Sequence, residues 1–417
     1  MSKSSKGSYM SKSLFPAVAA AVALAAGMAG STAVWAGEGP QVSKGAAKIL
    51  KAANDAYQAK NWNECVKKAQ EGNDLAGRTA FDSYVANQLL GTCYQRLGNN
   101  TEAVKAIEAQ LESGFMPAAQ QAQFTKSLAV IHYQQKNYAK SVELGNRVIK
   151  AGGADAEIYT VVGQGLYLQN KHEEAAKFIA DYVKDQESRG QQPKEQTLIL
   201  LRSAYERGNN NTGSADTLEK LVMYYPKKEY WNNLLYSVRK LKLTDRQTLQ
   251  VYRLMVATQT MQQPSDYAEM AELAISGGNP GEAKIVLDAG NAANVFVEPR
   301  DKDRTARMLT SLKDSTAKDQ ASLPKLEVEA KTAKTGDLDV ALGNAYLSYG
   351  QNDKAVAALN AGITKGGLKN LADAHLTLGI AQARAGDKAG ALKSFKAVKT
   401  DDPASTRIAK LWSLYVQ

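Results

Sequence analysis

The sequence predicts an all-α protein of about ten antiparallel helix pairs stacked one on the next. The composition favours helix, because Ala, Leu, Lys, Gln and Glu dominate and only ten of the 417 residues are proline. A chain of this length is longer than one compact domain usually needs, so it should be repetitive or contain several domains. One pattern of small and large residues also recurs along the chain, which favours the repeat.

The pattern is clearest in three segments. In each, a helical run ends at a short polar turn, and the second run carries an Ala and an apolar residue four positions later, on one side of a helix. The segments are "LLGTCYQRLGNNTEAVKAIEAQL" (89–111), "ALGNAYLSYGQNDKAVAALNAGI" (341–363) and "LTLGIAQARAGDKAGALKSF" (376–395). The small residue of the first run marks weaker copies at Asn54, Ala129, Gly163, Arg202, Leu235 and Ala271.

The mid-helix glycines are predicted to be packing positions. Glycine inside a helix costs about 1 kcal/mol relative to alanine. That cost is offset if the small residue lets two helices approach closely while a large neighbour fills the remaining space. One helix pair cannot bury its own apolar face, so neighbouring pairs must stack. We therefore assign Gly91, Gly163, Gly343 and Gly379 to the contact between helices and not to a ligand site.

The motif L-G-x-x-Y, then A-x-x-x-F, then Pro resembles the tetratricopeptide repeat, a helix-turn-helix unit of about 34 residues. The step from Ala129 to Gly163 is 34 residues, and the best single copy has Leu378, Gly379, Ala391, Phe395 and Pro403. The resemblance covers nearly all of residues 46–417. It implies a right-handed superhelical solenoid whose first helices line a concave groove for a peptide or a partner segment.

The expected organisation has five parts. Residues 1–36 form a signal peptide and residues 37–45 a short linker. N-terminal repeats occupy residues 46–295, a degenerate helical unit residues 296–336, and C-terminal repeats residues 337–417. The charge run "EPRDKDR" (298–304) in the degenerate unit is a solvated connection or a docking site.

The N-terminus has the order of an export signal. Lys3, Lys6 and Lys12 precede the apolar stretch "LFPAVAAAVALAAGMAG" (14–30), and "AVWA" (33–36) supplies small residues for cleavage after Ala36. Met10 is an alternative start. We expect an exported, periplasmic protein; the alternative is an N-terminal membrane anchor, although alanine-rich segments are weak spans.

Export would place the two cysteines, Cys65 and Cys93, in an oxidising compartment. They fall on helices that are neighbours in a stacked array, so a disulfide is geometrically possible. Two buried free thiols are the alternative, because the separation of the Cα atoms decides between them.

No pattern of catalytic or metal-binding residues is present. The three histidines belong to separate repeats, and no H-E-x-x-H, P-loop or G-x-S-x-G occurs. The net charge of +10 is scattered and not clustered, which argues against nucleic acid. The sequence therefore predicts no enzyme, no cofactor, no metal site and a protein partner.

The resemblance also supplies candidate groove residues. Tyr and Arg side chains offer large contact area with directional hydrogen bonds, although ordinary solvated helix surface is the plainer interpretation. Lys126 matches the lysine of the clamp that some relatives use for a C-terminal carboxylate, but Val130 stands where the clamp has asparagine, so we do not predict chaperone-tail binding. The candidates are Thr92, Gln95, Arg96, Tyr133, Gln134, Gln164, Tyr167, Arg207, Asn233, Tyr236 and Arg239.

We expect a non-catalytic scaffold or adaptor of the cell envelope that binds a polypeptide. Whole-chain likeness to exported bacterial tetratricopeptide-repeat proteins, some of them associated with TonB–ExbB–ExbD systems, implies an accessory role in energy transduction. One alternative is a periplasmic holdase for exported polypeptides. Another is a glycan-binding or cell-wall-acting solenoid, which the scarcity of tryptophan (four, one in the signal) disfavours.

Overall fold

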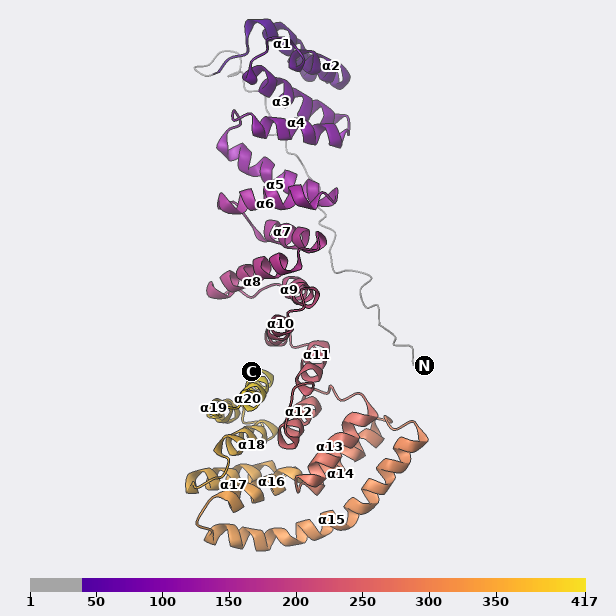
Figure 1. The fold of residues 1–417 in the computed structure, drawn as a ribbon, viewed down its shortest axis with the longest axis vertical. Helices are drawn as coiled ribbons and strands as arrows, with labels where there is room; N and C mark the ends of the chain where they lie inside the picture. Colours follow the sequence, from indigo (N-terminus) through magenta and orange to yellow (C-terminus); the bar gives the residue numbers. More distant parts are fainter. Residues whose placement is uncertain (1–39) are drawn as a thin grey trace. The chain divides into compact units, whose positions relative to one another are not determined.

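The computed structural model describes residues 40–417, which form twenty helices and no strand (Figure 1). The predicted all-α solenoid of helix pairs is confirmed. The chain divides into a compact N-terminal unit that ends at Ser214 and a C-terminal unit, Ala215–Gln417. The predicted signal peptide lies outside the described residues. Within residues 40–417, none of the helices combines the length and the apolar character needed to cross a bilayer.

The N-terminal unit consists of successive helix pairs. Each first helix packs against its own second helix, and the second packs against the first helix of the next pair. The first helices also meet one another, α1 on α3, α5 on α7 and α7 on α9. The bounds are α1 (Lys44–Gln58), α2 (Trp62–Asn73), α3 (Ala80–Arg96), α4 (Asn100–Glu112), α5 (Ala118–Gln134), α6 (Tyr138–Lys150), α7 (Ala156–Leu168), α8 (His172–Ser188) and α9 (Glu195–Arg207), followed by α10 (Asn211–Tyr224) at the boundary of the units.

The polar turns inside the pairs follow a common design. The first helix is followed by a residue in the left-handed region, such as Gly98 with φ 74° or Gly386 with φ 85°, and glycine adopts this conformation without steric cost. The next residue caps the second helix: Asn99 Oδ1 accepts from the Glu102 amide at 3.3 Å, and Asp387 Oδ1 from that of Gly390 at 2.8 Å. The Gly-Asn and Gly-Asp turns therefore set where these two pairs fold back, while Lys60, Lys136, Asn170 and Asn209 take the left-handed position in other pairs.

The predicted packing role of the mid-helix glycines is confirmed. A Cβ atom built on Gly379 would lie 2.4 Å from Cε1 of Phe395, and one on Gly343 would lie 2.6 Å from Cγ of Leu359. Gly163 faces Ile179 in the same way, at 2.9 Å. Each of these partners lies on the second helix of the same pair, so the glycine makes room for the large side chain opposite it.

Replacing Gly379 by valine is expected to lower the free energy of unfolding of the C-terminal unit by about 2 kcal/mol, since overpacking a core costs about 1–3 kcal/mol. Gly45→Val is the matched control, because a Cβ on this exposed helical glycine meets Leu75 only at 3.8 Å. The control should change stability by less than about 0.5 kcal/mol. Urea unfolding measures both; equal losses would contradict the packing role.

The C-terminal unit holds the remaining helices. Residues 296–336, expected as a degenerate unit, contain one 34-residue helix, α15, which packs on α14 and α16. The charge run opens this helix, and its Arg304 pairs with Glu272 of α13. The bounds are α11 (Lys228–Arg239), α12 (Asp245–Ala257), α13 (Pro264–Ser276), α14 (Pro280–Ala292), α15 (Pro299–Thr332), α16 (Asp337–Ser348), α17 (Asn352–Lys365), α18 (Leu371–Arg384), α19 (Lys388–Lys396) and α20 (Pro403–Val416).

The C-terminal unit curls back on itself, so that its last helix lies against its first ones (Figure 1). The Trp412 indole donates to the Gln250 carbonyl at 3.2 Å, which joins α20 to α12. Glu219 of α10 forms an ion pair with Arg407 of α20 at 3.0 Å and accepts a hydrogen bond from Lys410 of the same helix at 2.5 Å. This closure places α12, α14 and α18 around one pocket.

Candidate functional site

The candidate groove residues of α3 lie near its end. Thr92 and Gln95 are half-buried and Arg96 is exposed. The Thr92 hydroxyl donates to the Gln88 carbonyl of its own helix at 3.0 Å. The Arg96 guanidinium lies 5.9 Å from the ring centre of Trp62 in the preceding pair. Arg96 thus combines solvent exposure with an aromatic contact that orients it.

Two candidates from consecutive first helices are bonded to each other. The Tyr133 hydroxyl donates to Gln164 Oε1 at 2.7 Å, and Gln164 is buried. Burial raises the pKa of Tyr133 to about 12. The pair therefore joins α5 to α7, and Gln164 does not present an open surface. Gln134 and Arg207 are exposed, while Tyr167 is half-buried with its ring 5.0 Å from that of His172.

The candidates on α11 also serve the contact between helices. The Tyr236 hydroxyl donates to Asp266 of α13 at 2.6 Å, and Arg239 donates to Asp266 at 2.7 Å and to Glu269 at 2.9 Å. Burial would raise the pKa of Asp266, but these bonds and those from two backbone amides lower it. Asn233 is half-buried beside them. This cluster holds α11 to α13, so only part of it remains available to a partner.

Cys65 of α2 and Cys93 of α3 are joined by a disulfide, with their Cα atoms 6.3 Å apart. Both residues are fully buried. The bond ties the first helix pair to the second, and it settles within the structure a pairing that the sequence left open.

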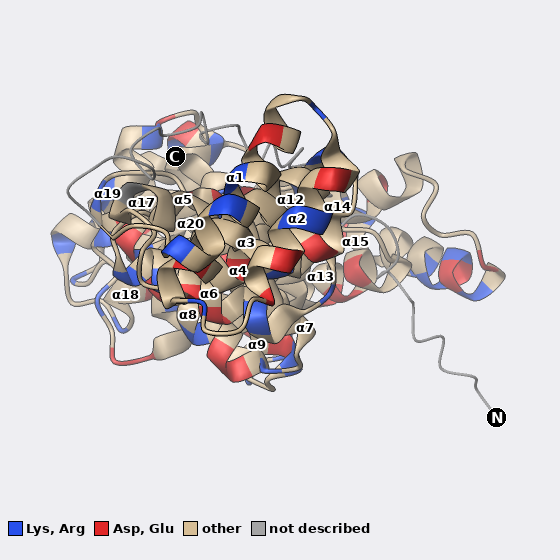
Figure 2. Cartoon of the chain, turned by 90° about the horizontal axis from the view of Figure 1, so that it is seen from above, with Lys and Arg blue, Asp and Glu red and all other residues tan. Residues whose placement is uncertain are grey.

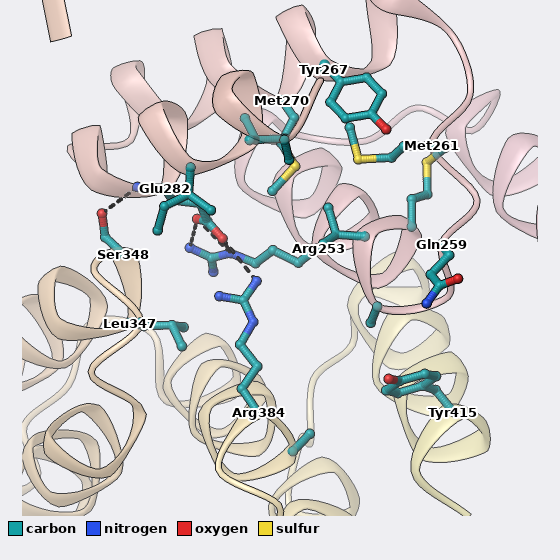
Figure 3. Close-up of a pocket in the computed structure, with 18 of the residues that line it drawn as sticks. Arg253, Gln259, Met261, Tyr267, Met270, Glu282, Leu347, Ser348, Arg384 and Tyr415 are labelled. Carbon is teal, nitrogen blue, oxygen red and sulfur yellow. Dashed lines mark hydrogen bonds and ion pairs between the residues drawn. The ribbon is translucent and has the colours of Figure 1, made fainter. Parts of the chain in front are cut away.

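The C-terminal unit contains a pocket that the sequence reasoning did not predict. Its volume is about 790 Å³, and helices α12, α13, α14, α16, α18 and α20 supply most of its wall (Figure 3). Most of the wall is apolar, and three methionines contribute to it. The apolar part of the wall includes Met255, Met261, Met270, Ile285, Val286 and Tyr415.

A buried ion cluster forms one side of this pocket (Figure 3). Arg253 of α12 donates from Nε to both oxygens of Glu282 at 3.0 Å and from Nη2 to one of them at 2.6 Å. Arg384 of α18 donates from Nη2 to Glu282 at 3.1 Å. The Glu282 amide in turn donates to the Ser348 hydroxyl at 2.9 Å. One carboxylate therefore connects α14 with α12, α16 and α18.

The cluster is charged at neutral pH. Burial alone would raise the pKa of Glu282, but the guanidinium groups of Arg253 and Arg384 outweigh it and lower the pKa to about 2. Burial, together with repulsion from Arg253, lowers the pKa of Arg384 from its usual high value. Two cations thus share one anion, and the cluster carries an excess positive charge beside an apolar wall.

One signal in the sequence pointed toward this cluster. Arg253 interrupts the apolar run "VYRLMVA" (251–257), and a charge on the buried side of a helix requires a partner. Its partner Glu282 is 29 residues further along, and Arg384, which shares this carboxylate, is another 102 residues beyond. No local spacing in the sequence therefore indicates the cluster. Elsewhere the charges are mixed, as Figure 2 shows with blue and red residues interspersed. Within residues 40–417, no group of three His, Cys, Asp or Glu side chains could hold a metal ion.

The tetratricopeptide-repeat family model matches residues 89–156 and 340–406. The first match lies in the N-terminal unit and the second in the C-terminal unit, and both fall on helix pairs. The chain therefore contains tetratricopeptide repeats in both units. Tetratricopeptide-repeat proteins are typically non-catalytic scaffolds that bind protein partners. No curated protein matches the sequence.

The chain matches solved structures at low sequence identity and over most of its length. A tetratricopeptide repeat protein from Parabacteroides merdae is 10% identical, with 89% of this chain and 99% of that chain covered and a TM-score of 0.26. The TPR2AB domain of yeast Sti1 in its pHSP90 complex is 14% identical, with coverages of 72% and 100% and a TM-score of 0.25. Yeast Tom70 is 11% identical, with coverages of 88% and 87% and a TM-score of 0.23.

Proposed function

We propose that this tetratricopeptide-repeat protein is a scaffold or adaptor of the cell envelope that binds a polypeptide partner along its N-terminal first helices. One observation carries the proposal. Arg96, Gln134 and Arg207 are each the last residue of a first helix, and all three are exposed. Helix α4 packs on both α3 and α5, α5 packs on α7, and α7 packs on α9. These first helices therefore follow one another along the array. We call Arg96, Gln134 and Arg207 the end row.

The chemistry of the end row suits an extended polypeptide. Two guanidinium groups and one amide offer hydrogen-bond donors, and the half-buried Tyr167 adds an aromatic surface at the corresponding end of α7. Arginine and tyrosine are enriched among the residues that dominate protein interfaces. The Tyr133–Gln164 bond fixes the two helices beneath this surface, which reduces the entropy lost when a partner binds.

Two features support the envelope setting. The first 36 residues carry the charge, apolar stretch and small-residue site of an export signal. The Cys65–Cys93 disulfide supports the same setting, because disulfides persist mainly in oxidising compartments. Likeness to exported tetratricopeptide-repeat proteins makes a component of a TonB-type energy-transducing system the first partner to test.

Site-specific photo-crosslinking in living cells tests the proposal. The crosslinker replaces Arg96, Gln134 or Arg207, and the matched controls replace Lys105 and Lys184, which are exposed on the second helices α4 and α8. We expect one enriched polypeptide at the end row and at least about tenfold less of it at the controls.

Other results would favour other functions. A broad mixture of unrelated exported polypeptides would instead favour the holdase. Captured cell-wall glycan without a polypeptide would favour the glycan-binding solenoid. Equal yields at the end row and at the control positions would contradict a binding surface on the first helices.

A further inference from the structure

We propose that the pocket of the C-terminal unit binds a long-chain carboxylate, with the carboxylate at Arg384 and the alkyl chain along Met255, Met261 and Met270. This site goes beyond the proposed function, because it takes a small amphiphile and lies in a different unit from the end row.

The charges of the pocket favour an anion. Its wall includes three cations, Lys228, Arg253 and Arg384, and one anion, Glu282. Glu282 already accepts three hydrogen bonds from Arg253. From Arg384 it accepts only one hydrogen bond, which Nη2 donates. Nε and Nη1 of Arg384 have no partner among residues 40–417, and 28% of the side chain remains exposed. A hydrogen bond from a guanidinium group to a carboxylate is stronger than one to a neutral acceptor.

The rest of the wall favours an alkyl chain. In Figure 3, Met261 and Tyr415 lie on the opposite side of the pocket from Glu282, and Met270 lies between Met261 and Glu282. Methionine side chains are flexible and polarizable, so they adapt to a chain of irregular shape. Ile285 is 54% exposed in this wall. An apolar ligand that covers this exposed side chain removes apolar surface from water, which favours binding.

A polypeptide fits this wall less well than an alkyl chain. Each residue of a bound peptide brings an N–H and a C=O group, and burying them without partners is costly. Ser348 already accepts from the Glu282 amide, and Gln259 lies exposed at the opposite side. A long-chain carboxylate has polar atoms only at its head, where Arg384 lies. A pocket of about 790 Å³ also falls within the range of roughly 300–1,000 Å³ that is usual for small-molecule sites.

Calorimetric titration of the purified chain with palmitate, with hexadecanol as the uncharged comparison, tests the site. We expect saturable binding of one palmitate per chain and hexadecanol binding that is weaker by about tenfold or more. Arg384→Met should weaken palmitate on the order of tenfold and leave hexadecanol unchanged. Arg253 keeps Glu282 paired in this variant, so the unit should stay folded.

A second variant tests the chain end of the pocket. Ile285→Glu places a carboxylate beside the alkyl chain and should weaken both ligands by about tenfold or more. Ile275→Glu is the matched control, because Ile275 is 43% exposed on α13 and does not line the pocket. It should bind palmitate as the unchanged protein does.

Three results would overturn the proposal. They are no saturable binding of palmitate, equal binding by the Ile285→Glu variant and its control, and displacement of palmitate by a hydrophobic peptide of equal affinity. If the Arg384→Met variant fails to fold, the Ile285→Glu variant still tests the proposal, because Ile285 is exposed and tolerates the substitution. A failure to bind palmitate would leave the expected crosslinking pattern of the end row unchanged, so each proposal can be contradicted without the other.

Discussion

Replacing Glu282 by glutamine is expected to lower the free energy of unfolding of the C-terminal unit by about 3–5 kcal/mol, because removing one partner of a buried ion pair leaves the other charges uncompensated. Arg253 is 1% exposed and Glu282 is 4% exposed. Two guanidinium groups would therefore face each other in the protein interior without the carboxylate. This is the largest effect that we expect from a single substitution.

Urea unfolding of the Glu282→Gln variant measures the loss. Glu272→Gln is the matched control, because its ion pair with Arg304 is about half-exposed on both sides. Exposed pairs contribute about 0–1 kcal/mol, so the control should lose no more than that. Similar losses in the two variants would contradict the structural role of the buried cluster.

The same carboxylate gives the C-terminal unit a defined pH dependence. The pKa of Glu282 is lowered to about 2 in the folded chain, against about 4.3 in an unfolded one. The ionised form therefore stabilises the fold fully above the unfolded pKa. That stabilisation, about 3 kcal/mol, is lost as the pH falls from about 4.3 to about 2. Unfolding measured across this range should show that the Glu282→Gln variant loses about 3 kcal/mol less stability than the unchanged protein. The loss that remains in the variant comes from other carboxylates with a lowered pKa, such as Asp266.

Replacing Cys65 and Cys93 by alanine is expected to destabilise the N-terminal unit by about 3–4 kcal/mol. The disulfide closes a loop with a sequence separation of 28. In the chain-entropy account, a cross-link of this span removes conformational entropy from the unfolded state and so raises its free energy by about that much. The loss should be greatest in α2 and α3, the helices that the bond joins directly. Hydrogen exchange resolved by segment measures it.

Thiol titration supplies the control for this prediction. The unchanged protein, denatured without reductant, should show no free thiol, and after reduction it should match the stability of the double alanine variant. Two free thiols before reduction, or a loss below about 1 kcal/mol, would contradict the prediction.

The helix pairs could be predicted because their contacts are local. Gly379 contacts Phe395, which is 16 residues later, and the L-G and A-x-x-x-F motifs contain both of these residues. The polar turns are equally local, since a left-handed glycine and an Asn or Asp cap follow each other in the sequence. The helix α15 was harder to predict, because Pro324 lies inside it and an interior proline usually ends or kinks a helix.

The pocket depends on contacts between residues that are far apart in the sequence, and no short sequence motif indicates such contacts. Closure of the C-terminal unit joins Glu219 to Lys410, which are 191 residues apart, and Gln250 to Trp412, which are 162 apart. Arg384 reaches Glu282 across 102 residues. The contacts of the candidate groove residues could also be predicted only in part. They were predicted to lie on first helices, but the bond of Tyr133 to Gln164 depends on how consecutive first helices pack.

The affinity of the crosslinked partner for charge-reversed chains tests the scaffold proposal most directly. The dissociation constant is measured for the unchanged protein, for Arg96→Glu combined with Arg207→Glu, and for Lys105→Glu as the matched control. The account predicts that the double variant binds about tenfold or more weakly, equivalent to about 1.4 kcal/mol, and that the control binds as the unchanged protein does. An unchanged dissociation constant for the double variant would contradict a partner surface on the end row.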